Sequence, residues 1–264
     1  MGPWKHIELE RHEAVAGLWL NRAELRNAFN ADLIGELSAC LAGLAQEEGL
    51  RALVLGGRGD VFCAGADLDY MRTVADIGEA ANYRDAMELA EMLAALDAFP
   101  CPVVARVQGA AMGGGVGLVA CCDIAVCTSD VRLGFSEVRL GLSPATIAPY
   151  VVGKIGATHA RHLFLTGERF DAEQALAYGL VHRIVEPEQL DSAVEAVVAD
   201  LMSGGPQAAR ATKRLLRTLG GIRDAATQAM TARLIAELRA SQEGQEGIAA
   251  FLDRRAPSWK PPQG

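Results

Sequence analysis

Apolar residues in the first part of the chain follow strand and helix periods in turn. Residues 7–11 and 15–20 alternate apolar with other residues, which predicts two paired strands joined by a short turn. Asn30 can cap a helix that runs to about residue 46, because leucines recur at helical spacing after it. The continuous apolar run at 52–57 suits a strand buried on both faces. The order strand, helix, strand predicts an α/β fold.

The pattern changes near residue 190, where strands stop and helices continue. We expect further strands at 103–107, 124–127, 131–135 and 180–185, and helices at 80–98 and 113–120. C-terminal helices are expected at 188–202, 206–218, 223–241 and 243–253, with glycine pairs among their breaks. The chain is therefore divided into an α/β core, residues 1–190, and a C-terminal helical region, residues 191–264.

The charge balance argues against polyanionic partners. The 264 residues carry 25 Lys and Arg against 33 Asp and Glu, a net charge of −8, with no long basic run. Nucleic-acid and anionic-membrane binding are therefore disfavoured. The apolar stretch 116–128 is too short to span a membrane and the N-terminus lacks a signal core, so we expect a cytoplasmic protein without membrane association.

The sulfur and histidine residues form no metal or hydrolase motif. The six cysteines include no C-x-x-C pair, which indicates buried, reduced thiols. His159 and His162 share one predicted helix without an H-E-x-x-H motif, and there is no G-x-S-x-G elbow. We therefore expect no metal site, and serine hydrolase chemistry has little support.

Two glycine-rich turns are the sharpest local features. Residues 108–117 join a buried strand to a helix, and consecutive glycines at a helix start let main-chain amides approach an anionic ligand closely. Residues 64–67 form a second turn with exposed amides after another buried strand. The two turns could each direct one N–H at a single carbonyl oxygen, as in a site that stabilises an enolate. The alternative is that both turns are packing devices where a strand approaches a helix.

Four sequence fragments occur in an order and at separations that point to a family. They are Leu20-Asn21-Arg22 with Asn27-Ala28-Phe29-Asn30, Phe62-Cys63-Ala64-Gly65-Ala66-Asp67-Leu68, Gln108-Gly109-Ala110 with Gly113-Gly114-Gly115, and Phe135-Ser136-Glu137-Val138-Arg139-Leu140-Gly141-Leu142. Together they resemble the enoyl-CoA hydratase/isomerase (crotonase) superfamily over almost the whole chain. Within it, the chain is most similar to bacterial methylglutaconyl-CoA hydratases of leucine degradation and to isohexenylglutaconyl-CoA hydratases.

The resemblance implies a fold, an assembly and a binding site. It implies a crotonase-like spiral of ββα units, and a C-terminal helical region that builds homotrimers or dimers of trimers. The N–H groups of Ala66 and Gly114 would hold the thioester oxygen of an acyl-CoA substrate. CoA is part of that substrate, so no separate cofactor is expected. The implied substrate and CoA contacts are Arg26, Ala28, Ala64, Ala66, Asp67, Leu68, Met112, Gly113, Gly114, Phe251 and Arg254, the last two reaching a neighbouring subunit.

The resemblance also assigns acid–base chemistry to Glu137 and leaves a second acid missing. The best-known hydratases carry two glutamates, of which one corresponds to Glu137 and the other to Gly117. A single Glu137 would accept a proton from the water that adds to Cβ and pass that proton to Cα. An apolar lining is expected to raise its pKa. The predicted members of that lining are Leu133, Phe135, Leu140 and Leu142.

Other positions refine the comparison with the family. Asp69 stands where the family has a lysine that contacts a CoA phosphate, and Ala145 stands where dienoyl-CoA isomerases have an aspartate. Arg139 either pairs with the distal carboxylate of a glutaconyl group or is solvated. Asp123, which could be mistaken for the missing acid, is predicted to have a structural hydrogen-bonding role.

We therefore expect hydration of a 2-enoyl-CoA thioester, of a branched glutaconyl type, to the 3-hydroxyacyl-CoA. Two alternatives stay open. The same single acid suits an enoyl-CoA isomerase that moves a proton between Cα and Cγ. The missing acid also suits an acyl-CoA-binding paralogue without catalytic activity.

Overall fold

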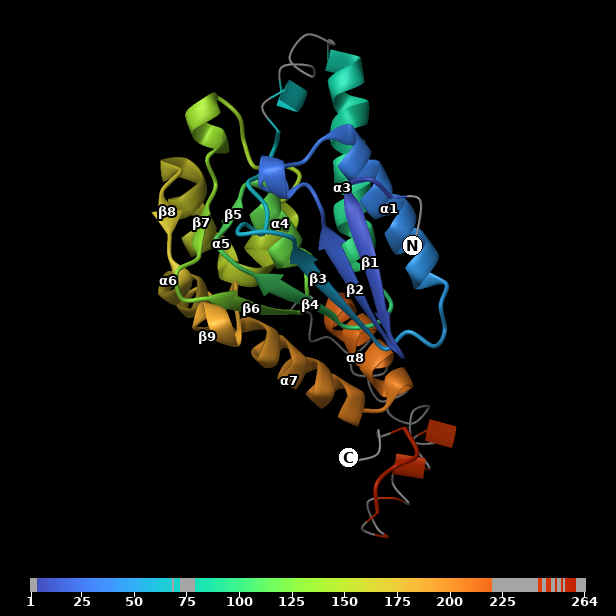
Figure 1. Cartoon of the computed structure of the whole chain (residues 1–264). Coiled ribbons are helices and arrows are strands. Elements are labelled where there is room, and N and C mark those ends of the chain that lie inside the picture. Colours follow the sequence, from blue (N-terminus) through green and yellow to red (C-terminus); the bar gives the residue numbers. More distant parts are fainter. Residues whose placement is uncertain are drawn as a thin grey trace.

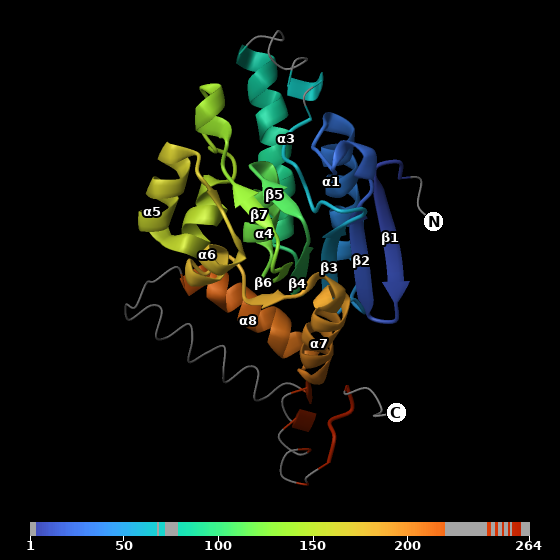
Figure 2. The same cartoon turned by 60° about the vertical axis from the view of Figure 1, so that its left-hand side comes forward.

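The computed structural model describes residues 4–67, 69–71, 79–219, 242–243, 246–247, 250, 253 and 255–259. These residues form two sheets, with helices against both faces of the larger one (Figures 1 and 2). The predicted α/β class is confirmed.

The larger sheet has six strands, and three neighbouring parallel strands among them end on the same side of the sheet. Its six strands are β1 (Ile7–His12), β2 (Val15–Leu20), β3 (Ala52–Gly57), β4 (Val103–Val107), β6 (Ile124–Thr128) and β9 (Arg183–Val185), in the order β1-β2-β3-β4-β6-β9. β1 and β2 form the predicted antiparallel hairpin, and the other neighbouring pairs are parallel. Every position of β3 is buried, as expected for a strand covered on both faces.

The smaller sheet consists of very short strands. They are β5 (Ala110–Met112), β7 (Arg132–Gly134) and β8 (Arg169–Phe170), in the order β5-β7-β8. The apolar pattern indicated β7 but not β5 or β8, because two or three residues are too few to show a period of two. β5 matters for function, since it leads directly into the glycines that begin the next helix.

The helices form the layers on either side of the large sheet. They are α1 (Ala31–Ala45), α3 (Glu79–Asp97), α4 (Gly114–Cys121), α5 (Ala148–Thr166), α6 (Ala172–Ala177), α7 (Leu190–Ser203) and α8 (Pro206–Leu219), with short 3-10 helices η1 (Ala23–Leu25), η2 (Glu137–Leu140) and η3 (Pro187–Gln189). The predicted cap of α1 is confirmed, because the Asn30 side chain accepts a hydrogen bond from the Leu33 N–H at 2.9 Å.

Two hydrophobic cores hold these layers to the sheet. The larger core joins the buried faces of α1, α3, α4 and α5 to the sheet, and the smaller one packs α7 on the opposite face. The smaller core contains Val194 and Val197 of α7 with Val54, Val104 and Val126 of the strands. All six cysteines are unpaired and buried, so the predicted burial is confirmed.

The helices beyond residue 190 are attached directly to the core. Lys213 of α8 is buried and pairs with Asp123 at 2.7 Å, and the same Asp123 oxygen accepts the Val103 N–H at 2.7 Å. The structural role predicted for Asp123 is confirmed. The helix predicted at 223–241 and most of that at 243–253 lie outside the described residues, and the division at residue 190 stays a prediction.

Candidate active site

Three loops that follow adjacent parallel strands meet at one edge of the large sheet. Residues 21–30 follow β2, residues 58–67 follow β3, and residues 108–113 follow β4. Because β2, β3 and β4 are parallel neighbours, their carboxyl ends lie together. This edge is where open α/β sheets bind ligands. Both glycine turns predicted from the sequence therefore belong to the same end of the molecule.

Main-chain bridges fix these loops relative to one another. Phe29 pairs with Ala66, through hydrogen bonds from the Phe29 N–H to Gly65 O at 2.7 Å and from the Asp67 N–H to Phe29 O at 2.8 Å. Cys63 pairs in the same way with Ala111 of β5. The Gly65 backbone, at φ 93°, lies so close to Met112 that an added Cβ would be 3.0 Å from the Met112 oxygen. A residue with a side chain would therefore separate the two turns.

The N–H groups of Ala66 and Gly114 are both free to donate to a ligand. The bridge to Phe29 uses the oxygen of residue 65 and the N–H of residue 67, so the N–H of Ala66 takes no part in it. Gly114 is the first residue of α4, where a helix leaves its N–H without an acceptor. Neither N–H has a protein acceptor among the described residues. Ala66 is exposed and Gly114 half-buried, so a ligand can reach both.

Glu137 lies against the start of the same helix. Its carboxylate is so close to the Gly113 backbone, at φ 49°, that an added Cβ there would lie 2.9 Å from Oε1. Its Oε2 atom is buried and has no hydrogen-bond partner among the described residues. Burial raises the pKa of the Glu137 carboxyl above its ordinary value. A half-buried acid with one buried, unused oxygen, beside a free helix N–H, is suited to exchanging protons with a bound molecule.

Two of the four apolar residues expected to line Glu137 are buried, and two are exposed to solvent. Leu133 and Phe135 are fully buried beneath the turn, but Leu140 and Leu142 are 58% and 56% exposed. The reason is that η2 is a surface turn ending at Gly141 in the left-handed conformation, which directs its later residues outward. The direction of the pKa shift is nevertheless as predicted.

Ile147 fills the space beside Gly117. An added Cβ at Gly117 would lie 2.3 Å from Ile147 Cγ2 and 3.8 Å from Leu93 Cδ2. Ile147, which is 1% exposed, ends the same connection between β7 and α5 that contains Glu137. No side chain of any size fits at Gly117 unless Ile147 moves. The second acid is therefore replaced by a packed apolar contact rather than by an empty space.

The other predicted contact residues are placed around the same loops. Arg26 is exposed, Ala28 is buried, and Ala64 and Met112 are half-buried. Asp67 follows Ala66, but its carboxylate is engaged by Arg22 and by the Asp69 N–H. Leu68, Phe251 and Arg254 lie outside the described residues. Contact of each of these residues with CoA stays a prediction.

Sequence reasoning gave no role to three residues that shape this site. Arg22 and Phe29 stand in the first family-like fragment, and Ile147 stands in no motif. Arg22 is buried ahead of a loop with two residues at positive φ, Arg26 and Asn27, which only the structure reveals. Nothing in the sequence indicated that Ile147 would meet Gly117.

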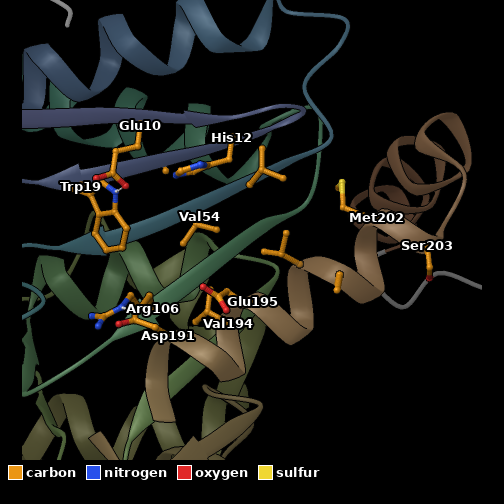
Figure 3. Close-up of a pocket in the computed structure, with 14 residues that line it drawn as sticks. Glu10, His12, Trp19, Val54, Arg106, Asp191, Val194, Glu195, Met202 and Ser203 are labelled. Atoms are coloured by element: carbon orange, nitrogen blue, oxygen red, sulfur yellow. Dashed lines mark hydrogen bonds and ion pairs between the residues drawn. The ribbon is translucent and has the colours of Figure 1, made fainter. Parts of the chain in front are cut away.

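A separate cavity lies on the opposite face of the large sheet (Figure 3). It has a volume of about 710 Å³ and lies between the β1–β4 strands and α7. Trp19, Val54 and Val194 contribute to its lining. None of its lining residues is a predicted site residue, so this cavity is distinct from the edge where Ala66, Gly114 and Glu137 lie.

A parallel α/β fold with two free main-chain N–H groups and a nearby half-buried acid is an arrangement suited to an enzyme that polarises a carbonyl group. Comparison with known proteins agrees with this class. The family described as enoyl-CoA hydratase/isomerase matches residues 10–262. The chain belongs to the enoyl-CoA hydratase/isomerase family.

Individual relatives extend along nearly the whole chain. The crystal structure of an enoyl-CoA hydratase from Shewanella pealeana is 40% identical with a TM-score of 0.94, and the match covers 97% of each chain. The 2,3-dehydroadipyl-CoA hydratase of Escherichia coli is 32% identical over 96% of this chain and 97% of its own. The trans-2-decenoyl-[acyl-carrier-protein] isomerase of Streptococcus mutans is 27% identical over 97% of this chain and 98% of its own. These matches confirm the crotonase-like fold and show that the protein is an enzyme.

The described residues contain neither a membrane-spanning helix nor a cluster of metal ligands. No helix in the described ranges is both long and apolar enough to cross a membrane. Within the same ranges, no three His, Cys, Asp or Glu residues are grouped as a metal ion would require.

Proposed function

We propose that the protein hydrates a 2-enoyl-CoA thioester, with Glu137 as the acid and base and the N–H groups of Ala66 and Gly114 as donors to the thioester oxygen. The observation that carries this proposal is the buried, unpartnered Oε2 of Glu137 beside the start of α4. A carboxylate in this position has unused capacity to hold a water molecule and to accept its proton.

The reaction then needs no group beyond those named. Water oxygen bonds to Cβ while Glu137 accepts one of its protons, and the C=C electron pair moves toward the thioester carbonyl. The two N–H groups stabilise the enolate oxygen that forms. Glu137 next donates the proton to Cα, which restores the carbonyl and the ionised acid. The raised pKa of Glu137 favours this second transfer, because it makes the protonated form easier to reach near neutral pH.

We further propose that the acyl group of the substrate is a branched glutaconyl group. This assignment rests on the similarity of the four sequence fragments, and Arg139 supports it. Arg139 lies in the same short helix as Glu137, is exposed, and its guanidinium has no ion-pair partner among the described residues. A distal carboxylate on the acyl group would provide one. Arg139→Met should then lower kcat/KM for glutaconyl-CoA thioesters but not for crotonyl-CoA.

The experiment that tests the reaction is a product-resolved assay in heavy-oxygen water. The protein is incubated with trans-2-enoyl-CoA, trans-3-enoyl-CoA and glutaconyl-CoA thioesters, and the products are separated by mass. We expect a 3-hydroxyacyl-CoA that carries the label. Conversion of the trans-3 to the trans-2 compound without label, and without hydration, would contradict the proposal.

The isomerase reaction is the second candidate, because the Gly117–Ile147 contact leaves one acid where two would divide the work of hydration. A single carboxylate can move a proton between Cα and Cγ without water. The labelled-water assay separates these reactions. If neither reaction occurs across the panel while acyl-CoA still binds, the non-catalytic binding role is the better account.

Self-association as a trimer or dimer of trimers is proposed with the same function, on the basis of the family resemblance. A cytoplasmic location is proposed with it. A monomer-sized particle in light scattering would contradict the assembly.

A further inference from the structure

We propose that the buried Arg22–Asp67 ion pair is the positioning device of the candidate oxyanion site, acting on the Ala66 N–H through the main chain. This inference rests on the proposed function. It concerns residues that make no contact with the reacting atoms, so Arg22 and Asp67 are positioning residues rather than catalytic ones.

Arg22 connects two loops through its two terminal nitrogens. Arg22 is 5% exposed. Its guanidinium donates one hydrogen bond to the Ala28 carbonyl oxygen and another to Asp67 Oδ2, the second at 2.8 Å. The two acceptors lie on the loops after β2 and β3. A planar guanidinium holds two acceptors at a fixed separation, which a flexible single-point donor does not. Arg22 therefore sets the spacing between these loops.

Asp67 links the position of Arg22 to the main chain at Ala66. Its Oδ2 accepts from Arg22 and its Oδ1 accepts from the Asp69 N–H at 2.9 Å, so both oxygens are held. The hydrogen bond from Arg22 lowers the pKa of Asp67, which keeps the carboxylate charged. Because Asp67 is the next residue after Ala66, fixing its side chain fixes the peptide that follows the proposed donor.

Phe29 completes the connection to the second donor. Its main chain brackets Ala66 through the bridge described above, and it directly follows Ala28, which Arg22 holds. Its ring lies against Gly114, where an added Cβ would be 2.9 Å from Phe29 Cε2. Phe29 thus touches the residues of both proposed donors. Arg22 anchors the chain on either side of the Phe29–Ala66 bridge, at Ala28 and at Asp67.

The geometry implies a measurable separation of binding and catalysis. Arg22 is not itself one of the proposed CoA contacts, but its loss frees the Ala66 peptide to turn. We expect Arg22→Met to lower kcat about ten- to a hundredfold, as small misplacements at a reacting centre do. KM should change by no more than about threefold. Arg22→Lys should recover part of the loss, because an ammonium group reaches one of the two acceptors.

The direct readout is carbonyl polarisation. In a Glu137→Gln background, in which we expect turnover to be slow, a chromophoric cinnamoyl-CoA thioester is bound and its absorption is recorded. Absorption moves to the red when the thioester oxygen accepts hydrogen bonds. We expect the red shift of the parent to shrink with Arg22→Met or Asp67→Asn. Arg106→Met is the matched control, since Arg106 is also ion-paired, with Asp191, but faces the cavity on the other side of the sheet.

The outcomes distinguish a failure of the oxyanion site from a failure of the positioning role alone. If the Glu137→Gln parent gives no red shift, the oxyanion site fails and this inference fails with it. If the parent gives the shift and Arg22→Met retains both the shift and kcat, only the positioning role is wrong. Should Arg22→Met not fold, Asp67→Asn and Arg22→Lys carry the test, and full kcat with an unchanged shift in either would overturn the inference.

Discussion

Two successive turns of α4 face the same connection between β7 and α5, and they meet opposite kinds of side chain. At the first turn, Gly113 lies beneath the Glu137 carboxylate, whose Oε2 is left without a partner. One turn later, Gly117 lies against Ile147, with no space between them. Both positions lack a side chain for a steric reason, but the first makes room for the carboxylate to which we assign the proposed chemistry, and the second makes room for an apolar contact. A glycine in a motif therefore does not show which of the two purposes it serves.

The largest effect is expected from removing the charge at the first turn. Glu137→Gln should lower turnover by about 10²- to 10⁴-fold, the usual contribution of a positioned acid or base. Binding of acyl-CoA should persist, because the amide keeps nearly the same shape. Steady-state kinetics and calorimetric titration measure the two quantities. The exposed Glu188 of η3, changed to Gln, is the control. Unchanged turnover in Glu137→Gln would mean that the contact at the first turn, like the contact at the second turn, serves packing and not catalysis.

A second test addresses the N–H at the start of α4. Gly114→Pro removes this donor at a helix position where proline is well tolerated, and we expect a loss of about 10²- to 10³-fold in kcat. Gly114→Ala is the matched control, because it also places a Cβ beside the Phe29 ring but keeps the N–H. Equal rates for the two variants would show that the loss comes from the Cβ and not from the missing donor.

The second turn is tested by stability. Gly117→Ala should lower the free energy of unfolding by about 1–3 kcal/mol, because its Cβ would overlap Ile147 in a packed core. Gly153 lies in α5, exposed and with open space at its Cβ, so Gly153→Ala should instead stabilise by about 0.5–1 kcal/mol. Urea unfolding compares them. Adding Ile147→Val to Gly117→Ala should recover part of the loss; independent, additive effects would argue against direct contact.

The smallest expected effect is the pH dependence of the first turn. Burial raises the folded-state pKa of Glu137 above 4.5, so the folded protein holds this proton more tightly than the unfolded chain does. The contribution of Glu137 to stability is therefore fully present below the ordinary value and is lost as the pH rises through the folded pKa. Glu137→Gln does not titrate. Its unfolding free energy relative to the natural protein should be higher at pH 7 than at pH 4. A difference of the opposite sign would mean that the carboxylate is stabilised by an unseen partner.

Much of the fold could be predicted from local pattern. The β1–β2 hairpin, the buried β3, the Asn30 cap and the helical starts after residues 113 and 188 followed from periods and capping residues. β5 and β8 could not, because strands of two or three residues carry no periodic signal. The exposure of Leu140 and Leu142 was also missed, since an apolar residue on a surface turn looks the same in sequence as one that lines a site.

The sequence by itself determined the family-like motifs, the glycines that permit two exposed amide turns, and the presence of Glu137 without a second glutamate. Only the tertiary structure decided that Phe29 lies between Ala66 and Gly114, that Arg22 holds Asp67, and that Ile147 occupies the space beside Gly117. The physical reason is distance along the chain. Periodicity and capping are set by neighbours within a few residues, whereas these contacts join residues tens of positions apart and exist only once three parallel strands bring their loops to one edge.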